Sequence, residues 1–208
     1  AMLPVAGRPL LRRLVDEFKK QGIDAVTVVA GYQAHSIDLP DIEVVENPGH
    51  AASGELASLA CAREAIGEDT VVSYGDLLFR SYILRDLLES AGELVVVVDS
   101  SPIPEKRGQQ RDLAYCSAPD DHALFPQDVK LLRVDAQPRP EADAPSGRWI
   151  GMLRVRGRGR SWLLQALDAL AQRPDFCRLG LPDLLNCLIE MGRPIQVLYV
   201  SGHWLDVN

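Results

Sequence analysis

The first hundred residues alternate short apolar runs with amphipathic stretches, and this alternation limits the possible folds more than any other feature of the chain. Four runs have the composition of buried strands, at residues 25–30, 42–47, 70–74 and 93–99. Three stretches carry apolar side chains at helical spacing, at residues 8–21, 54–66 and 80–91. Strands that alternate with helices form a sheet covered by helices on both faces. We therefore expect an α/β fold with a Rossmann-like, mixed and mostly parallel sheet.

The second half of the chain is less regular. Further strands are predicted at residues 113–118, 129–135, 148–157 and 194–202, and further helices at 161–172 and 181–192. Half of the 14 prolines and many charges fall between Ser100 and Gly147, where residues 138–147 have the composition of a loop. We expect one domain over residues 1–208, with an irregular insertion at about 100–147.

Composition excludes several classes of function. The chain has 208 residues and a net charge of −7, which argues against nonspecific nucleic-acid binding as its main role. We interpret the basic run RVRGRGR, residues 154–160, as a solvated turn. No run approaches about 18 apolar residues, so no membrane-spanning helix is expected. The four cysteines form no CxxC motif, which indicates reduced thiols and a cytoplasmic protein.

Two aspartates directly follow predicted strands. Asp76 comes after the run VVSY and Gly75, and Asp206 comes just after the last strand and Gly202. In open α/β sheets ligands bind at the carboxyl ends of strands. Carboxylates together with substrate phosphates are the oxygen ligands that Mg²⁺ prefers. We expect Asp76 and Asp206 to bind Mg²⁺, and a plain turn or cap role is the alternative for each.

Five segments carry motifs, in the order LPVAGRPLL at 3–11, ENPGHAASGELASLACA at 46–62, YGD at 74–76, RWIGM at 148–152 and GHWLDVN at 202–208. Together they resemble the MobA-like and sugar-phosphate nucleotidyltransferase superfamily. The resemblance is closest to 2-aminoethylphosphonate and choline-phosphate cytidylyltransferases, and it extends along almost the whole chain. Each segment is a weak signal alone, and the set in this order is specific to the superfamily.

One part of the family pattern is missing from these residues. The family's first strand, its glycine-rich GxGxR loop and the lysine that follows would all precede Ala1. A sheet of this kind lacks its central strand without that segment. We therefore expect an N-terminal segment ahead of Ala1, and a short tail beyond Asn208. A protein that truly began at Ala1 would be expected to have neither stability nor activity.

The resemblance implies transfer of a nucleotidyl group from an NTP to a phosphate or phosphonate oxygen, with release of pyrophosphate. It implies that Asp76 and Asp206 are the catalytic, metal-binding residues and that Mg²⁺ is the cofactor. Nucleotide contacts are expected from Pro4, Asn47, Ser58 and Gly75. Acceptor contacts are expected from Ser53, Glu55, Arg111, Lys130, Arg148 and Trp149.

Ordinary structural roles stay open for most of these residues. Ser58 could bond to its own helix backbone, and Glu55 could be a favoured acid of a first helical turn. Trp149 could be a core residue, and the three cations could be solvated surface charges.

The acceptor is the least constrained part of this prediction. The SGELASL stretch, residues 53–59, is closer to phosphonate cytidylyltransferases than to hexose-1-phosphate enzymes. We therefore expect CMP transfer from CTP to a phosphonate such as 2-aminoethylphosphonate. Choline phosphate or a sugar 1-phosphate is the alternative acceptor, and a non-catalytic nucleotide-binding module is the alternative of another class. A homodimer and a fused or neighbouring phosphoenolpyruvate mutase are further expectations.

Overall fold

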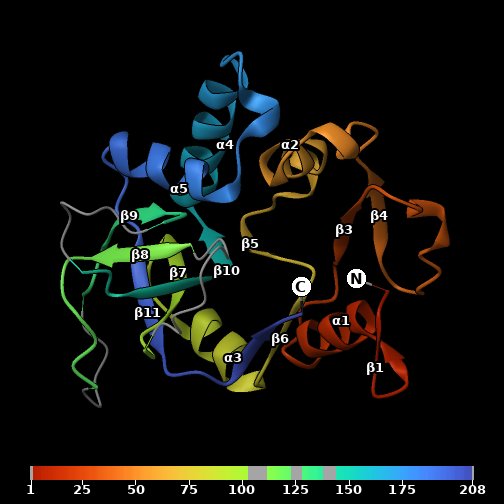
Figure 1. Cartoon of the computed structure of the whole chain (residues 1–208), viewed down its shortest axis with the longest axis horizontal. Coiled ribbons are helices and arrows are strands. Elements are labelled where there is room, and N and C mark those ends of the chain that lie inside the picture. Colours follow the sequence, from red (N-terminus) through yellow and green to blue (C-terminus); the bar gives the residue numbers. More distant parts are fainter. Residues whose placement is uncertain (1, 103–111, 123–127, 138–143, 208) are drawn as a thin grey trace.

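A six-stranded sheet is the largest sheet among the described residues and lies mostly on the left in Figure 1. The computed structural model describes residues 2–102, 112–122, 128–137 and 144–207. The strand order is β11-β7-β10-β8-β9, and β5 pairs with β10 beside this path. The six strands are β5 (Asp69–Ser73), β7 (Leu94–Asp99), β8 (Leu113–Cys116), β9 (Leu131–Asp135), β10 (Gly147–Arg156) and β11 (Gln196–Val200).

The sheet is mixed, and most of its strands share one direction. β11 runs parallel to β7, whereas β10 is antiparallel to β5, β7 and β8, and β9 is antiparallel to β8. Four strands therefore point one way, while β10 and β9 point the other way. β10 lies between β7 on one side and β5 and β8 on the other. Most neighbouring strands in the sheet are therefore antiparallel.

Helices cover both faces of this sheet, as the alternating pattern predicts. They are α1 (Leu10–Lys20), α2 (Glu55–Cys61), α3 (Ser81–Glu89), α4 (Arg158–Ala171) and α5 (Leu181–Glu190). The predicted helix over 54–66 is shorter than expected, because α2 ends at Cys61 and a 3₁₀ turn follows at Arg63–Ala65. Other 3₁₀ turns lie at Ala34–Ser36, His50–Ala52 and Phe176–Arg178.

The valine run of β7 divides the core into two layers. Leu94, Val96 and Val98 belong to the cluster that contains the apolar faces of α4 and α5. Val95 and Val97 belong to the cluster that contains those of α1 and α3. All five side chains are fully buried, because successive side chains of a strand point to opposite faces and both faces are covered.

Three two-stranded pairs flank the main sheet. β3 (Thr27–Ala30) is parallel to β4 (Glu43–Glu46), as the sequence predicts. β1 (Pro4–Val5) pairs with β2 (Arg8–Pro9), and β6 (Leu77–Phe79) pairs with β12 (Trp204–Asp206). The sequence did not indicate these last two pairs, since strands of two or three residues are too short for a periodic signal.

The interpretation of the basic run at 154–160 as a solvated turn is wrong for its first residue, Arg154. This side chain is buried within β10 and forms a two-bonded ion pair with Asp69, with distances of 2.9 and 2.6 Å. Its guanidinium also donates to the carbonyls of Leu87, Leu88 and Ser90, where α3 ends. Arg154 therefore joins β10 and β5 to α3 and satisfies carbonyls that the helix end leaves unpaired.

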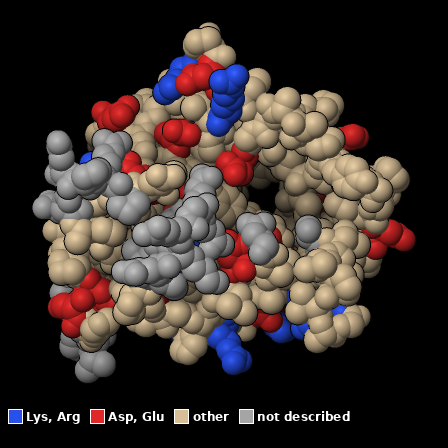
Figure 2. All heavy atoms as spheres, viewed as in Figure 1, with Lys and Arg blue, Asp and Glu red and all other residues tan. Residues whose placement is uncertain are grey.

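An opening separates the β3–β4 pair from the main sheet. Among the described strands, β3 pairs with β4 alone and β5 pairs with β10 alone. Figure 1 shows β3 and β5 facing each other across this space, and Figure 2 shows a hole through the molecule near its middle. Within the part of the chain that is described, no helix is both long and apolar enough to cross a membrane.

Candidate active site

The β6–β12 pair brings the two predicted metal-binding aspartates side by side. Asp76 lies in the turn between β5 and β6, and Asp206 is the last residue of β12. Asp206 stands opposite Leu77 in the antiparallel register, and the Val207 amide donates to the Asp76 carbonyl at 3.0 Å. Two residues from distant parts of the chain thus become neighbours across one strand pair. This adjacency is what a shared cation would need.

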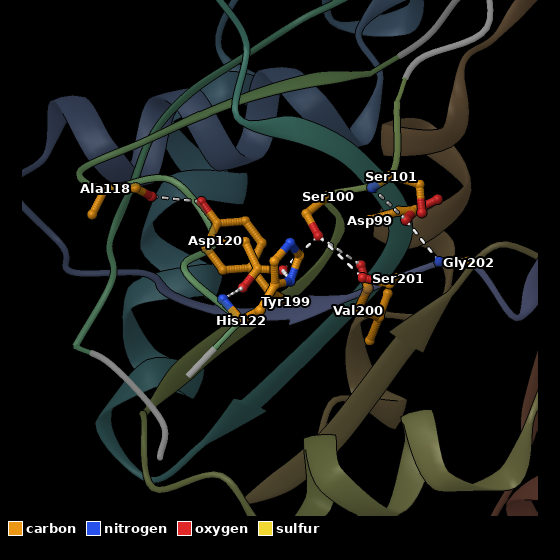
Figure 3. Close-up of polar contacts among 10 residues, drawn as sticks. All are labelled: Asp99, Ser100, Ser101, Ala118, Asp120, His122, Tyr199, Val200, Ser201 and Gly202. Carbon is orange, nitrogen blue, oxygen red and sulfur yellow. Dashed lines mark hydrogen bonds and ion pairs between the residues drawn. The ribbon is translucent and has the colours of Figure 1, made fainter. Parts of the chain in front are cut away.

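A buried carboxylate at the end of β7 holds the segment that carries Asp206 (Figure 3). Asp99 accepts hydrogen bonds from the Gly202 and Ser101 amides, at 2.9 and 3.0 Å, and from the Trp204 indole N–H at 2.8 Å. Burial alone would raise the pKa of Asp99, but the amide and indole donors together lower it. Asp99 is therefore an ionised anchor, and the sequence analysis missed this role.

The connection after β8 is attached to the same edge of the sheet, as Figure 3 shows. The Ser100 hydroxyl lies 2.5 Å from Asp120 and 3.2 Å from the Val200 carbonyl. The Tyr199 hydroxyl donates to the Ala118 carbonyl at 2.7 Å. These contacts join the ends of β7 and β11 to residues 118–120 and restrain the edge where ligands bind in α/β sheets.

An aromatic side chain directly precedes the YGD turn. The Tyr74 ring lies against the backbone of Gly151, where a Cβ atom would overlap the ring, and Gly151 has a φ of +84°. The RWIGM glycine is thus required both for its left-handed backbone and for the space that Tyr74 occupies. The Tyr74 amide donates to the Gly151 carbonyl at 3.1 Å, which fixes the two segments together.

Trp149 supports Tyr74 from behind rather than lining an open pocket. Its side chain is 2% exposed, its indole N–H donates to the Met152 carbonyl at 2.9 Å, and its ring centroid lies 5.5 Å from that of Tyr74. The prediction that Trp149 contacts the acceptor is corrected, because a ring this buried presents almost no surface to a ligand.

Asp112 is the second site residue that the sequence analysis missed. It directly precedes β8, has a φ of +41°, and accepts a hydrogen bond from the Tyr74 hydroxyl at 3.4 Å. Burial raises the pKa of Asp112 to about 6; the charges of Glu55 and Asp206 add to this, while Tyr74 and Arg148 oppose it. A turn-forming aspartate in an irregular region gives no periodic signal, so only the fold brings it to Tyr74.

Asn47 is a positioning residue rather than a nucleotide contact. It is 4% exposed, donates to the hydroxyls of Ser53 and Ser58 at 3.0 Å each, and accepts from the Gly49 amide at 2.9 Å. The prediction of a direct contact is therefore corrected for Asn47, whose side chain is buried and uses both of its N–H donors inside the protein. Each serine hydroxyl accepts from Asn47 and keeps its own proton to donate, so their binding roles remain predictions.

The start of α2 is fixed against the segment that precedes α5. The Gly54 amide donates to the Cys177 carbonyl at 2.7 Å, and a Cβ atom on Gly54 would overlap the Leu179 carbonyl. Glu55, the first residue of α2, places its carboxylate beside Gly180 at the start of α5. Its charge still raises the pKa values of both Tyr74 and Asp112, so Glu55 faces the same site.

Of the remaining predicted residues, some lie near Asp76 and Asp112 and others lie elsewhere. Arg148 lies near Asp112 and stacks over the Trp204 ring, 4.8 Å from its centroid. Gly75 forms the turn beside Asp76, and Pro4 lies in the β1–β2 hairpin. Arg111 lies outside the described residues.

Lys130 lies away from Asp112, and its contact with the acceptor stays a prediction. Its amide and carbonyl pair with Ser117, which follows β8, whereas Asp112 precedes β8. Five residues of extended chain span roughly 16 Å, so Lys130 is at the opposite end of this hairpin from the site. Its ammonium group instead lies 3.8 Å from Asp128.

The donor set fits a magnesium ion that takes part of its ligands from a substrate. Within the described residues, no group of three or more His, Cys, Asp or Glu side chains is arranged to hold a metal. Asp76 and Asp206 provide two carboxylates on paired strands. Magnesium usually binds one or two carboxylates together with waters and substrate phosphates, so two protein ligands are sufficient.

Comparison with known proteins agrees with this geometry. The model of the MobA-like NTP transferase domain matches residues 1–139. The chain belongs to this family. This match confirms the predicted family.

Its relatives of known function are distant. It is 29% identical over 112 residues to the bifunctional protein GlmU of Stenotrophomonas maltophilia, which covers 51% of the chain and 25% of GlmU. It is 29% identical over 110 residues to the CMP-5'-(3-aminopropyl)phosphonate synthase of Streptomyces rubellomurinus, which covers 49% of the chain and 17% of that synthase. The MobA-like chain thus spans only a part of the length of these relatives.

Solved structures confirm the expected fold over the whole chain. The CTP:phosphocholine cytidylyltransferase of Streptococcus pneumoniae aligns with a TM-score of 0.72 at 15% identity, covering 100% of this chain and 83% of that one. A UDP-glucose pyrophosphorylase complexed with UDP-glucose aligns with a TM-score of 0.76 at 16% identity, covering 99% and 84%. The mixed α/β sheet with helices on both faces is the nucleotidyltransferase fold.

Proposed function

We propose that this MobA-like domain transfers CMP from CTP to a phosphonate such as 2-aminoethylphosphonate and releases pyrophosphate. The observation that carries the proposal is the adjacency of Asp76 and Asp206 across the β6–β12 pair, at the ligand-binding edge of a nucleotidyltransferase fold. Family membership supports the use of an NTP.

The reaction needs little proton transfer, since a phosphonate is already ionised near neutral pH. One of its oxygens attacks the α-phosphorus of CTP, a new P–O bond forms, and the bond to pyrophosphate breaks. Catalysis is then alignment and charge neutralisation. Asp76 and Asp206 would hold Mg²⁺, which when bound supplies positive charge beside the phosphate oxygens.

The residues of this chain supply the positioning. Asp99 and Trp204 fix the segment that carries Asp206, while Asn47 fixes the serines at the start of α2. Arg148 is a cation beside Asp112 that suits an acceptor phosphonate, because its guanidinium offers paired donors. The glycine-rich loop and lysine expected ahead of Ala1 would bind the β- and γ-phosphates.

Two relatives favour a cationic phosphorus-containing acceptor. One is a curated relative named a CMP-5'-(3-aminopropyl)phosphonate synthase, and the other is a similar structure, a CTP:phosphocholine cytidylyltransferase. Both names combine a cytidine nucleotide with a phosphorus compound that carries nitrogen, an amine in the first and a quaternary ammonium group in the second. Choline phosphate is therefore the first alternative acceptor. A sugar 1-phosphate is the second, because UDP-glucose is the ligand of a similar structure. A non-catalytic nucleotide-binding module is the alternative of another class.

The test is pyrophosphate release by the full-length protein with Mg²⁺. CTP, UTP, GTP and ATP are each combined with 2-aminoethylphosphonate, choline phosphate and glucose 1-phosphate. We expect release with CTP and the phosphonate, and its loss in Asp76→Ala and Asp206→Ala. Asp168→Ala is the matched control, since this exposed carboxylate pairs with Arg63 on the surface of α4.

Each outcome of this panel decides between the functions. Release with another pair keeps the chemistry and changes the substrate. Nucleotide binding without release by any pair would overturn catalysis in favour of the binding module. Activity that survives both aspartate variants would overturn the assigned site.

We also propose that the reaction takes place in the cytoplasm. The four cysteines are free thiols, as a reducing cytoplasm would keep them. A homodimer and a fused or neighbouring phosphoenolpyruvate mutase stay predictions, which size-exclusion chromatography with light scattering and the sequence of the full-length protein would test.

A further inference from the structure

One carboxylate oxygen of Asp112 has no hydrogen-bond partner within the described protein. One oxygen accepts from the Tyr74 hydroxyl at 3.4 Å, while the other is buried without any hydrogen-bond partner among the described residues. Leaving a buried acceptor unsatisfied costs about 1–3 kcal/mol. The left-handed backbone of Asp112, with φ at +41°, adds strain to this position. A residue that destabilises the free protein in two ways is expected to gain its partner from a ligand.

The carboxylates around this oxygen favour a positively charged ligand. The carboxylates of Glu55 and Asp206 both act electrostatically on Asp112, and those of Asp76 and Glu55 act on Tyr74. Arg148 is the one cation that contributes to the pKa of Asp112 among the described residues. Carboxylates gathered in one place favour a cationic ligand, because an opposite charge nearby stabilises them.

Tyr74 is held in a fixed orientation beside Asp112. Its ring is held between the backbone of Gly151 and the ring of Trp149. Its hydroxyl donates to a carboxylate oxygen of Asp112 at 3.4 Å. Tyr74 therefore orients this carboxylate.

We propose that Asp112, oriented by Tyr74, is the specificity-determining residue that binds the cationic amine of the acceptor. The inference rests on the proposed function, because it places the amine in the same site where Asp76 and Asp206 hold the phosphorus end. It selects an aminoalkyl phosphonate or phosphate over a neutral sugar phosphate. A neutral sugar would leave the Asp112 oxygen without a donor, whereas an ammonium group would donate to this oxygen and offset the charges of Asp112 and Glu55, the two carboxylates here that are not assigned to Mg²⁺.

The test compares two acceptors that differ only in charge. 2-Aminoethylphosphonate and n-propylphosphonate have similar shapes, and the second replaces the ammonium group by a methyl group. Their dissociation constants are measured by calorimetry on the full-length protein with CTP and no metal, and their kcat/KM values are measured with Mg²⁺. We expect the wild type to prefer the amine by about 10- to 100-fold in both measurements. In Asp112→Asn we expect this preference to fall to about 1.

Controls separate recognition from other roles of Asp112. Asp168→Asn, which removes a surface carboxylate on α4, is expected to keep the full preference. The Mg²⁺ concentration that gives half-maximal rate with n-propylphosphonate should be the same in Asp112→Asn and the wild type. A shifted Mg²⁺ requirement, or equal losses for both acceptors, would overturn the proposal in favour of a metal or catalytic role.

The binding measurement keeps this inference separate from the proposed function. Preferential binding of the amine that Asp112→Asn abolishes supports the inference, even if no pyrophosphate is released with any acceptor. Equal binding of the two acceptors by the wild type would overturn the inference, even if pyrophosphate release with CTP establishes the proposed reaction.

Discussion

Asp112 is a residue whose role in stability should oppose its role in binding. Its carboxylate faces Glu55 and Asp206, which disfavour ionisation, and Tyr74 and Arg148, which favour it, while burial dominates. The pKa of about 6 in the folded protein lies above the ordinary value of 3.8. The folded state therefore holds a proton that the unfolded state has already released in this range.

The raised pKa of Asp112 makes the protein less stable as the pH rises. The stability linked to Asp112 is full below about pH 3.8 and is lost as the pH rises through about 6. Asp112→Asn does not titrate, so we expect it to be more stable than the wild type by about 1–3 kcal/mol at about pH 8, and to lose this advantage near pH 4. Urea denaturation in metal-free buffer at both pH values measures this, and an advantage that does not depend on pH would contradict it.

Asp99 should act on the metal site through the segment that it holds. Asp99→Asn keeps the side-chain shape but removes the charge that three N–H donors share. Since such outer residues typically change metal affinity or activity by about 10- to 100-fold, we expect the Mg²⁺ requirement to rise by this factor. Titration of activity with Mg²⁺ tests it, with Asp120→Asn as a control at the same sheet edge. An unchanged requirement in Asp99→Asn would show that Asp206 is held without this anchor.

At the scale of elements, the junction between β5 and β10 depends on one glycine. Gly151→Ala would force a side chain into the Tyr74 ring at a φ of +84°. We expect it to lower the free energy of unfolding by about 2–4 kcal/mol, because overpacking and backbone strain add. Gly67→Ala, whose nearest neighbour atom would be 3.7 Å away, should change stability little. Equal denaturation midpoints for the two variants would contradict this reading of the junction.

Elements with strong periodicity were predictable, and those set by distant contacts were not. The run at 93–99 is unmistakably a buried strand, because five consecutive apolar residues fill two layers of core. β6 and β12 were missed because each exists only through its pairing with the other. Asp76 and Asp206 could be found since they follow strands, whereas Asp112 and Asp99 depend on contacts that no local pattern records. The side-chain role of Asn47 likewise follows only from its two serine partners.

At the scale of the whole molecule, the opening between β3 and β5 is a place where a further strand could pair with both. Each of these strands pairs on one side alone among the described strands. Unpaired backbone groups along two facing edges favour insertion of another strand. We propose that residues ahead of Ala1 provide it, which is also where the family's phosphate-binding loop would begin.

Hydrogen exchange tests this proposal directly. The chain that begins at Ala1 is compared with the full-length protein. We expect the amides of residues 27–30 and 69–73 to exchange more slowly in the full-length protein, and its denaturation midpoint to be higher, because a third strand satisfies both edges. Amides of β8 and β9, far from the opening, serve as the internal reference. Equal exchange at β3 and β5 in the two proteins would overturn the proposal.

The pairing of β6 with β12 also has a consequence for synthesis. Asp76 leaves the ribosome early, but its partner on β12 is among the last residues described. Contacts between residues so far apart in sequence form late, because a long loop must close first. A nascent chain therefore has no complete pair of carboxylates until Asp206 has emerged, and under the proposed mechanism nucleotide turnover would begin only after translation has passed this strand.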